Sequence, residues 1–182
     1  MTIIIVVAIV ALLVFWVVGI QNKLVKADEL CKNALRQINV QQVSRYDALK
    51  ALVKLTREYA AYEGDTLQKV IEARKITASA APSVADINAN EQALNSALSR
   101  LIAVAERYPD LKANQSYQQT MQDIKSYEEN VRLSRMTFND TVTKYNNQVR
   151  MFPGSLVAGL LGFPQRDYLA EDTSKNEYPD II

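Results

Sequence analysis

Residues 3–20 form an apolar run without a charged side chain, and the first charge along the sequence is Lys23. A helix rises about 1.5 Å per residue, so this run is long enough to cross the roughly 30 Å of hydrocarbon in a bilayer. A cleaved signal peptide would need a basic n-region and a small-x-small cleavage site. Residues 15–21 read Phe-Trp-Val-Val-Gly-Ile-Gln and offer no such site. We therefore expect an uncleaved transmembrane anchor over residues 1–21.

The residues that flank this run predict how it lies in the membrane. Trp16 stands near one end, where an indole ring suits the headgroup interface. Lys23 and Lys26 follow the run, whereas no Lys or Arg precedes it. The positive-inside rule then places the bulk of the chain in the cytoplasm and the N-terminus outside.

The composition excludes most kinds of chemistry. The sequence has no histidine, one cysteine and only five glycines, so the commonest general base and metal ligand is missing. No P-loop, dinucleotide fingerprint or nucleophile elbow appears. Lys and Arg total 21 against 20 Asp and Glu, so no net field attracts nucleic acid. We predict no catalytic, cofactor-binding or metal-binding residue.

The spacing of apolar residues and helix breakers predicts an all-α fold. Residues 22–81 contain no proline, and an apolar seam at helical spacing begins at Leu24. The first plausible break is at Gly64, so the anchor is expected to continue directly into a stalk helix. Three more helices are predicted, over residues 67–78, 87–108 and 114–151. Together they suggest an antiparallel bundle of long helices over residues 22–152.

Two charged residues, Glu128 and Arg135, occupy apolar seam positions of the last predicted helix. Because burying an unpaired ion is costly, partners are expected on the other helices. Arg45, Arg74 and Glu91 are the candidates. These five residues predict one or two buried polar layers that fix helix register. The alternative is that the seam drifts and the charged groups reach solvent at the groove edge.

The chain changes character over residues 153–182. Phe152-Pro153-Gly154 stops the last helix, and the apolar segment that follows is too short to span a bilayer. We expect it to be an association surface rather than core, in lipid or against a neighbouring subunit. Its contact residues are Leu156, Val157, Leu160, Leu161 and Phe163. From Gln165 on the sequence is polar and net acidic, and without a partner it is expected to be poorly ordered.

Several motifs resemble those of the LemA family of bacterial membrane-anchored helical proteins. The most specific are Tyr-Pro-Asp-Leu-Lys-Ala-Asn at residues 108–114 and Phe-Pro-Gly-Ser-Leu-Val-Ala-Gly-Leu-Leu-Gly-Phe at residues 152–163. Further motifs lie at residues 21–25, 34–41, 45–49, 59–63, 72–74 and 145–146. The sequence departs from the family pattern at Leu35, where Trp is usual, and at Tyr62, where His is usual.

This resemblance implies an antiparallel bundle on an N-terminal transmembrane helix, with no established enzymatic activity. A branch of the family takes part in forming magnetosome membranes. We therefore expect a scaffold in the bacterial inner membrane that self-associates and organises or remodels the bilayer. Its partners would be lipid and further copies of itself, without nucleic acid or cofactor. The alternative is an adaptor that presents its bundle to another membrane protein, such as a protease.

Overall fold

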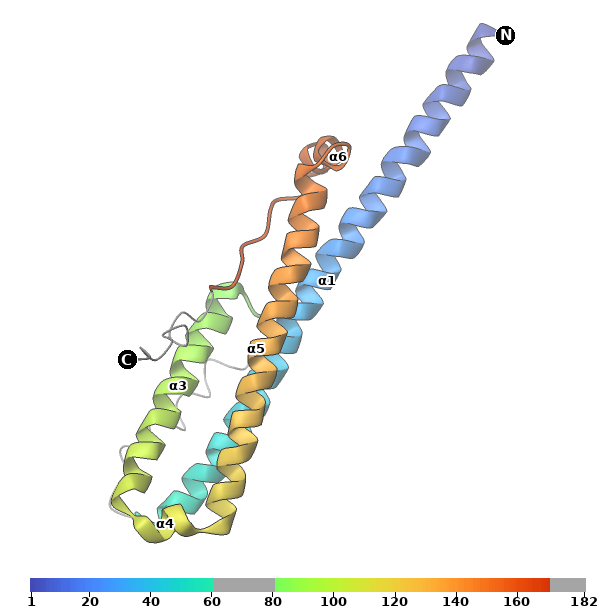
Figure 1. Ribbon diagram of the computed structural model, residues 1–182. Coiled ribbons are helices and arrows are strands. Elements are labelled where there is room, and N and C mark those ends of the chain that lie inside the picture. Colours follow the sequence, from blue (N-terminus) through green and yellow to red (C-terminus); the bar gives the residue numbers. More distant parts are fainter. Residues whose placement is uncertain (61–80, 171–182) are drawn as a thin grey trace, which may run out of the picture.

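The computed structural model describes residues 1–60 and 81–170, and these residues form helices and connecting segments without a strand. The expected all-α fold is confirmed (Figure 1). The helices are α1 (Thr2–Tyr59), α3 (Val84–Arg107), α4 (Pro109–Ala113), α5 (Gln115–Arg150) and α6 (Gly154–Leu161). The predicted helix over residues 67–78, with Arg74, and the acidic residues beyond 170 lie outside the described residues.

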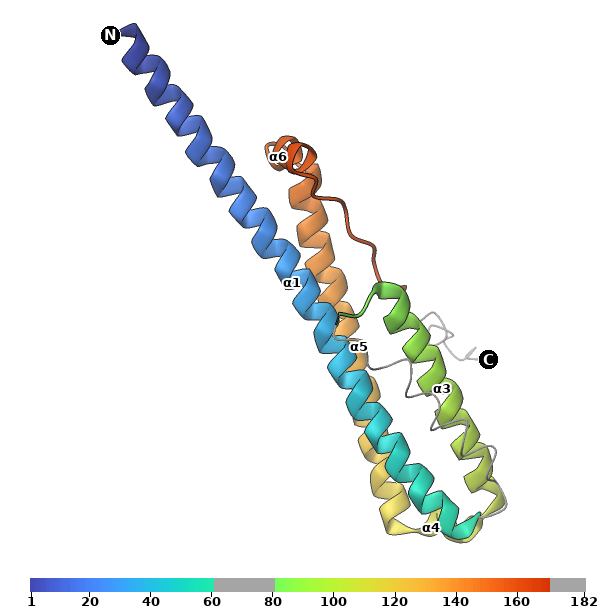
Figure 2. The ribbon, with the colours of Figure 1, turned by 180° about the vertical axis from the view of Figure 1, so that it is seen from behind.

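Helix α1 joins the anchor to the bundle without interruption over 58 residues. Its most apolar 18-residue window has a mean hydropathy of 3.4, and none of that window is buried within the protein. Burial begins at Leu24 and continues along one face to Thr56. The first third of α1 therefore projects beyond the other helices as a bare apolar rod, while the rest is a bundle helix (Figures 1 and 2).

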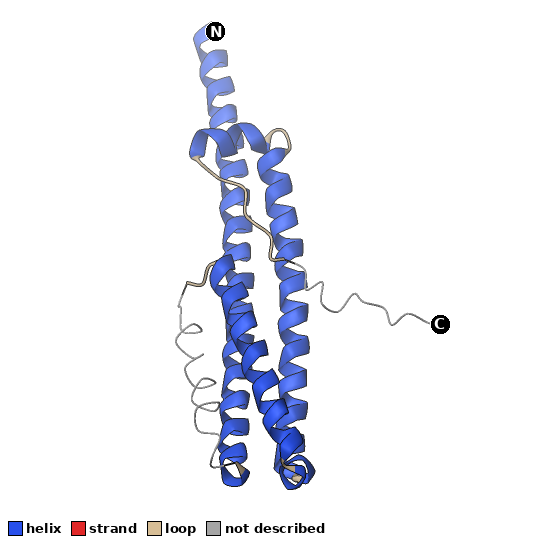
Figure 3. Ribbon diagram, turned by 90° about the vertical axis from the view of Figure 1, so that its left-hand side faces the viewer, coloured by secondary structure: helices blue, strands red, loops and turns tan. Residues whose placement is uncertain are grey.

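Helix α5 runs back along α1, and α3 packs against α1 (Figures 1 and 3). Side chains cap α3 and α5 at their first turns. Ser83 and Asp86 form a capping box at α3, and the Asn114 side chain accepts hydrogen bonds from the amides of Ser116 and Tyr117 at α5. Such caps satisfy amide groups that have no partner within the helix. The short helix α4, with Pro109 in its first turn, turns the chain from α3 into α5.

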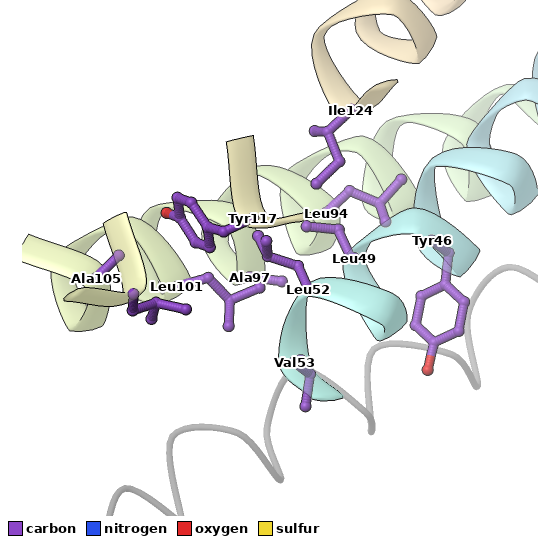
Figure 4. Packing of buried hydrophobic residues seen from close by; sticks show 11 residues of the cluster. Tyr46, Leu49, Leu52, Val53, Leu94, Ala97, Leu101, Ala105, Tyr117 and Ile124 are labelled. Atoms are coloured by element: carbon purple, nitrogen blue, oxygen red, sulfur yellow. The ribbon is translucent and has the colours of Figure 1, made fainter. Parts of the chain in front are cut away.

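The core is divided along the bundle axis into three clusters. The cluster farthest from the anchor joins α1, α3, α4 and α5, and Leu49, Leu94 and Ile124 meet at its centre (Figure 4). A middle cluster contains Cys31 and Ile38 of α1, which pack against side chains of α5. A small third cluster joins α1 to α6 at the end of the bundle nearest the anchor. Each fully buried leucine contributes roughly 1.5–3 kcal/mol, which makes packing the main force that holds these helices together.

Candidate functional site

The guanidinium group of Arg45 lies inside the bundle, with 0% of the side chain exposed. Its Nη1 donates to Glu91 Oε1 at 2.8 Å, and its Nη2 donates to Asn95 Oδ1 at 2.8 Å. The same Nη2 lies 3.8 Å from Glu128 Oε2 of α5, whose side chain is 30% exposed. The structure thus brings Arg45, Glu91 and Glu128 together from α1, α3 and α5.

Two amide side chains that the sequence analysis missed extend this polar layer. Gln42 Nε2 donates to the carbonyl oxygen of Ile87 at 3.0 Å and to Glu91 Oε2 at 3.1 Å. Asn90 Nδ2 donates to Gln42 Oε1 at 3.4 Å. The polar interruption of the α1 seam, between Ile38 and Leu49, was the available signal. These contacts pair α1 with α3 at one register and give the layer a structural role.

Arg135 lies apart from this layer, about two helical turns along α5 from Glu128, or roughly 10 Å. Its Nη2 donates to the carbonyl oxygen of Ala170 at 2.6 Å and contacts Asn88 Oδ1 at 3.5 Å. Among the described residues, the charge of Arg135 is therefore met by a backbone carbonyl and an amide oxygen, in place of the expected carboxylate. The partner comes from the C-terminal segment, which periodicity does not place against α5.

Residues 163–170 form an extended strap that returns along the bundle from the end of α6. Asn146 holds it through the backbone of Arg166, since the amide Nδ2 donates to the carbonyl oxygen and Oδ1 accepts from the N–H, both at 2.9 Å. Asn139 holds Leu169 in the same two-bond arrangement, at 3.1 and 3.0 Å. The two asparagines stand one heptad apart on α5, so they meet the strap on one helix face.

Side chains add to this backbone recognition. The Arg166 guanidinium pairs with Asp28 of α1 at 2.6 Å and lies over the ring of Tyr145, 5.8 Å from its centroid. Burial raises the pKa of the Asp28 carboxyl, but hydrogen bonds from Lys32 and Arg166 outweigh this and hold that pKa below its usual value. Tyr145 donates to the carbonyl oxygen of Pro164 at 2.7 Å. The expectation of a poorly ordered chain from Gln165 on was therefore wrong as far as Ala170.

Replacing Asn146 by alanine should open the strap locally. The substitution removes both hydrogen bonds to Arg166, which together contribute about 1–2 kcal/mol. We expect amide hydrogen exchange of residues 165–168 to accelerate roughly tenfold, because about 1.4 kcal/mol corresponds to a factor of ten. The matched control is Asn147→Ala, at the exposed neighbouring position. Equal protection of the strap in both variants would contradict this account of how it is held.

Helix α6 lies on α1 at the end of the bundle nearest the anchor. Val157 is only 2% exposed and, with Ala158, packs on Leu24 of α1. Phe163 packs against the same cluster, whereas Leu156, Leu160 and Leu161 are exposed. The prediction that the segment is not core was therefore wrong for Val157. The stop at Pro153 detaches α6 from the α5 seam but does not prevent it from folding back onto α1.

The predicted membrane-interface residues surround this point. Trp16 is an exposed residue of the apolar rod, and Lys23 and Lys26 are exposed on α1 beside the α6 contact. Over the described ranges, no group of three or more His, Cys, Asp or Glu side chains is arranged to hold a metal ion. Cys31 is buried in the middle core cluster, and burial raises the pKa of its thiol. That cysteine is a packed core residue kept in its protonated form.

Residues 34–182 match the sequence profile of the LemA family. Among individual proteins, the chain is similar to magnetosome proteins MamQ 1 and MamQ 2 of Paramagnetospirillum magneticum, each 29% identical over 75 residues. It is equally similar to magnetosome protein MamQ of Magnetospirillum gryphiswaldense, also at 29% identity over 75 residues. Each match covers 41% of this chain and 28% of the relative.

Proposed function

Because this chain belongs to the LemA family, we propose that it is a membrane-anchored helical scaffold that self-associates and organises or reshapes the bilayer without catalysis. The continuity of α1 is the observation that carries this proposal. One helix supplies both the apolar rod and a core face of the bundle, from Thr2 to Tyr59. The bundle is therefore coupled to the membrane without a flexible hinge, so that copies would hold neighbouring patches of lipid in a defined orientation.

The magnetosome relatives favour an organising role over an adaptor role. The relatives bear the name of an organelle rather than of an enzyme. We further propose that the bundle faces the cytoplasm from the bacterial inner membrane, because Lys23 and Lys26 follow the apolar run directly.

Self-association is tested by the molar mass of the full chain in mild detergent. We expect light scattering on the purified protein to give a uniform particle of several chains, each of 20.4 kDa. Electron microscopy of vesicles that carry increasing amounts of the protein should then show clustered protein and altered vesicle shape. A monomer at every concentration, in round vesicles with dispersed protein, would contradict the scaffold and favour the adaptor.

A further inference from the structure

Helix α6 is apolar on nearly every side. Its sequence is Gly-Ser-Leu-Val-Ala-Gly-Leu-Leu, in which Ser155 is the single polar side chain. A helix that is apolar all round is stable only where its whole surface leaves water. The protein covers Val157 and Ala158, yet Leu160 is 85% exposed and Leu156 is 57% exposed. Something other than the described part of this chain must therefore cover the outer face.

The contacts of α6 give its depth relative to the bilayer. Its buried side packs on Leu24 and, less deeply, on Val17 and Ile20 of α1. These residues straddle the point where the apolar run ends and Lys23 begins the charged part of the chain. The helix also crosses the end of α5 at a steep angle to α1, seen end-on in Figure 1 and lengthwise in Figure 3. With α1 crossing the bilayer, α6 lies along the membrane surface at the boundary between hydrocarbon and headgroups.

The charged residues around this position are basic. Lys23 and Lys26 are exposed on α1, and Arg150 is exposed in the last turn of α5 next to α6. The first acidic residue of α1, Asp28, is paired with Lys32 and Arg166. An apolar helix face bordered by exposed cations matches a leaflet that contains anionic lipid.

We propose that α6 is an interfacial helix that inserts Leu156 and Leu160 into an anionic leaflet beside the anchor. Its apolar face is continuous with the apolar surface of α1, so one lipid environment covers both. With α1 as the first point of attachment and α6 as the second, the bundle is held at fixed height and tilt. The inference requires that α1 spans the membrane, but it does not require self-association.

Tryptophan fluorescence in vesicles tests this insertion. The full chain carrying Trp16→Phe and Leu160→Trp is reconstituted into vesicles of phosphatidylcholine and phosphatidylglycerol with brominated acyl chains. We expect blue-shifted emission and quenching several-fold stronger than for a control that carries Trp16→Phe and Leu133→Trp. Leu133 is also an exposed leucine, but it lies midway along α5, away from the end of the bundle that carries α6. Equal quenching at the two positions would overturn the proposal.

Two further measurements separate lipid from the other occupant, a second copy of this chain. Quenching at position 160 should be independent of the protein-to-lipid ratio. If quenching falls as this ratio rises, Leu160 contacts a neighbouring subunit in place of lipid, and the proposal is overturned. Replacing both Leu156 and Leu160 by aspartate should leave particle mass in detergent unchanged, and dispersal of the particles would likewise overturn it. Quenching should also weaken in phosphatidylcholine alone, and an unchanged value would overturn the preference for anionic lipid.

Discussion

Replacing Glu91 by alanine is expected to lower the free energy of unfolding by roughly 3–5 kcal/mol. The substitution leaves the guanidinium of Arg45 inside the bundle without its closest carboxylate, which lies 2.8 Å away and is itself largely buried. Gln42 also loses a hydrogen-bond acceptor. Among the described residues, Glu128 is the other acid near this guanidinium, at 3.8 Å and closer to solvent, and it compensates only in part. Urea unfolding of the full chain in detergent micelles, followed by circular dichroism, measures the loss.

Two controls show whether the loss comes from a stranded charge. Glu129→Ala removes an exposed ion pair with Arg132, so it should cost at most about 1 kcal/mol. Replacing Arg45 and Glu91 together by methionine should recover most of the stability, because a buried ion pair is often no more stable than apolar side chains of similar volume. Small and equal losses for Glu91→Ala and Glu129→Ala would show that the Arg45 layer is unimportant for folding.

The sequence was sufficient to predict the three long helices of the described residues, α1, α3 and α5, because their signals are local and repeated. The lack of proline over residues 22–81 and the apolar steps along α5 each follow from helix geometry. Charged residues in the seam likewise pointed to a polar layer. Which of the two acids lies closer to Arg45 was not predictable from the sequence. The rotation of each helix about its axis decides this, and it leaves Glu128 at the groove edge and puts Glu91 directly beside Arg45.

The strap and the placement of α6 depend on contacts without a repeating pattern. Asn139 and Asn146 are polar helix residues, and in the sequence they are indistinguishable from a solvated face. Their partners are backbone groups of Leu169 and Arg166, which any residue type other than proline provides. Such recognition leaves almost no trace in side-chain composition. For α6, the stop at Pro153 marks a change of direction. The new direction is set by the close approach of the backbone at Gly154 to the backbone of Gln148.

Gly154→Ala is expected to displace α6 from α1. The chain turns so tightly between α5 and α6 that a β-carbon on Gly154 would press into the backbone carbonyl oxygen of Gln148. Because that obstacle is backbone, it cannot rotate away, and relief requires α6 to move and Val157 to leave its site on Leu24. The cost is about 2–3 kcal/mol, either as overpacking or as lost burial. Amide hydrogen exchange of residues 155–163 should accelerate at least tenfold, while the melting of the bundle changes little because the other two core clusters are untouched.

Gly159→Ala provides the opposite expectation within the same short helix. A β-carbon at Gly159 meets no other atom within 4 Å, and the residue lies inside α6. Alanine there removes the conformational entropy cost of glycine, so α6 should gain roughly 0.5–1 kcal/mol and its amides should exchange more slowly. If α6 were sensitive to any substitution, both variants would accelerate its amide exchange. If only the turn at Gly154 is tightly packed, Gly154→Ala accelerates exchange and Gly159→Ala slows it. The sign at Gly159 therefore decides whether α6 is positioned by its turn at Gly154 or is only loosely attached to the bundle.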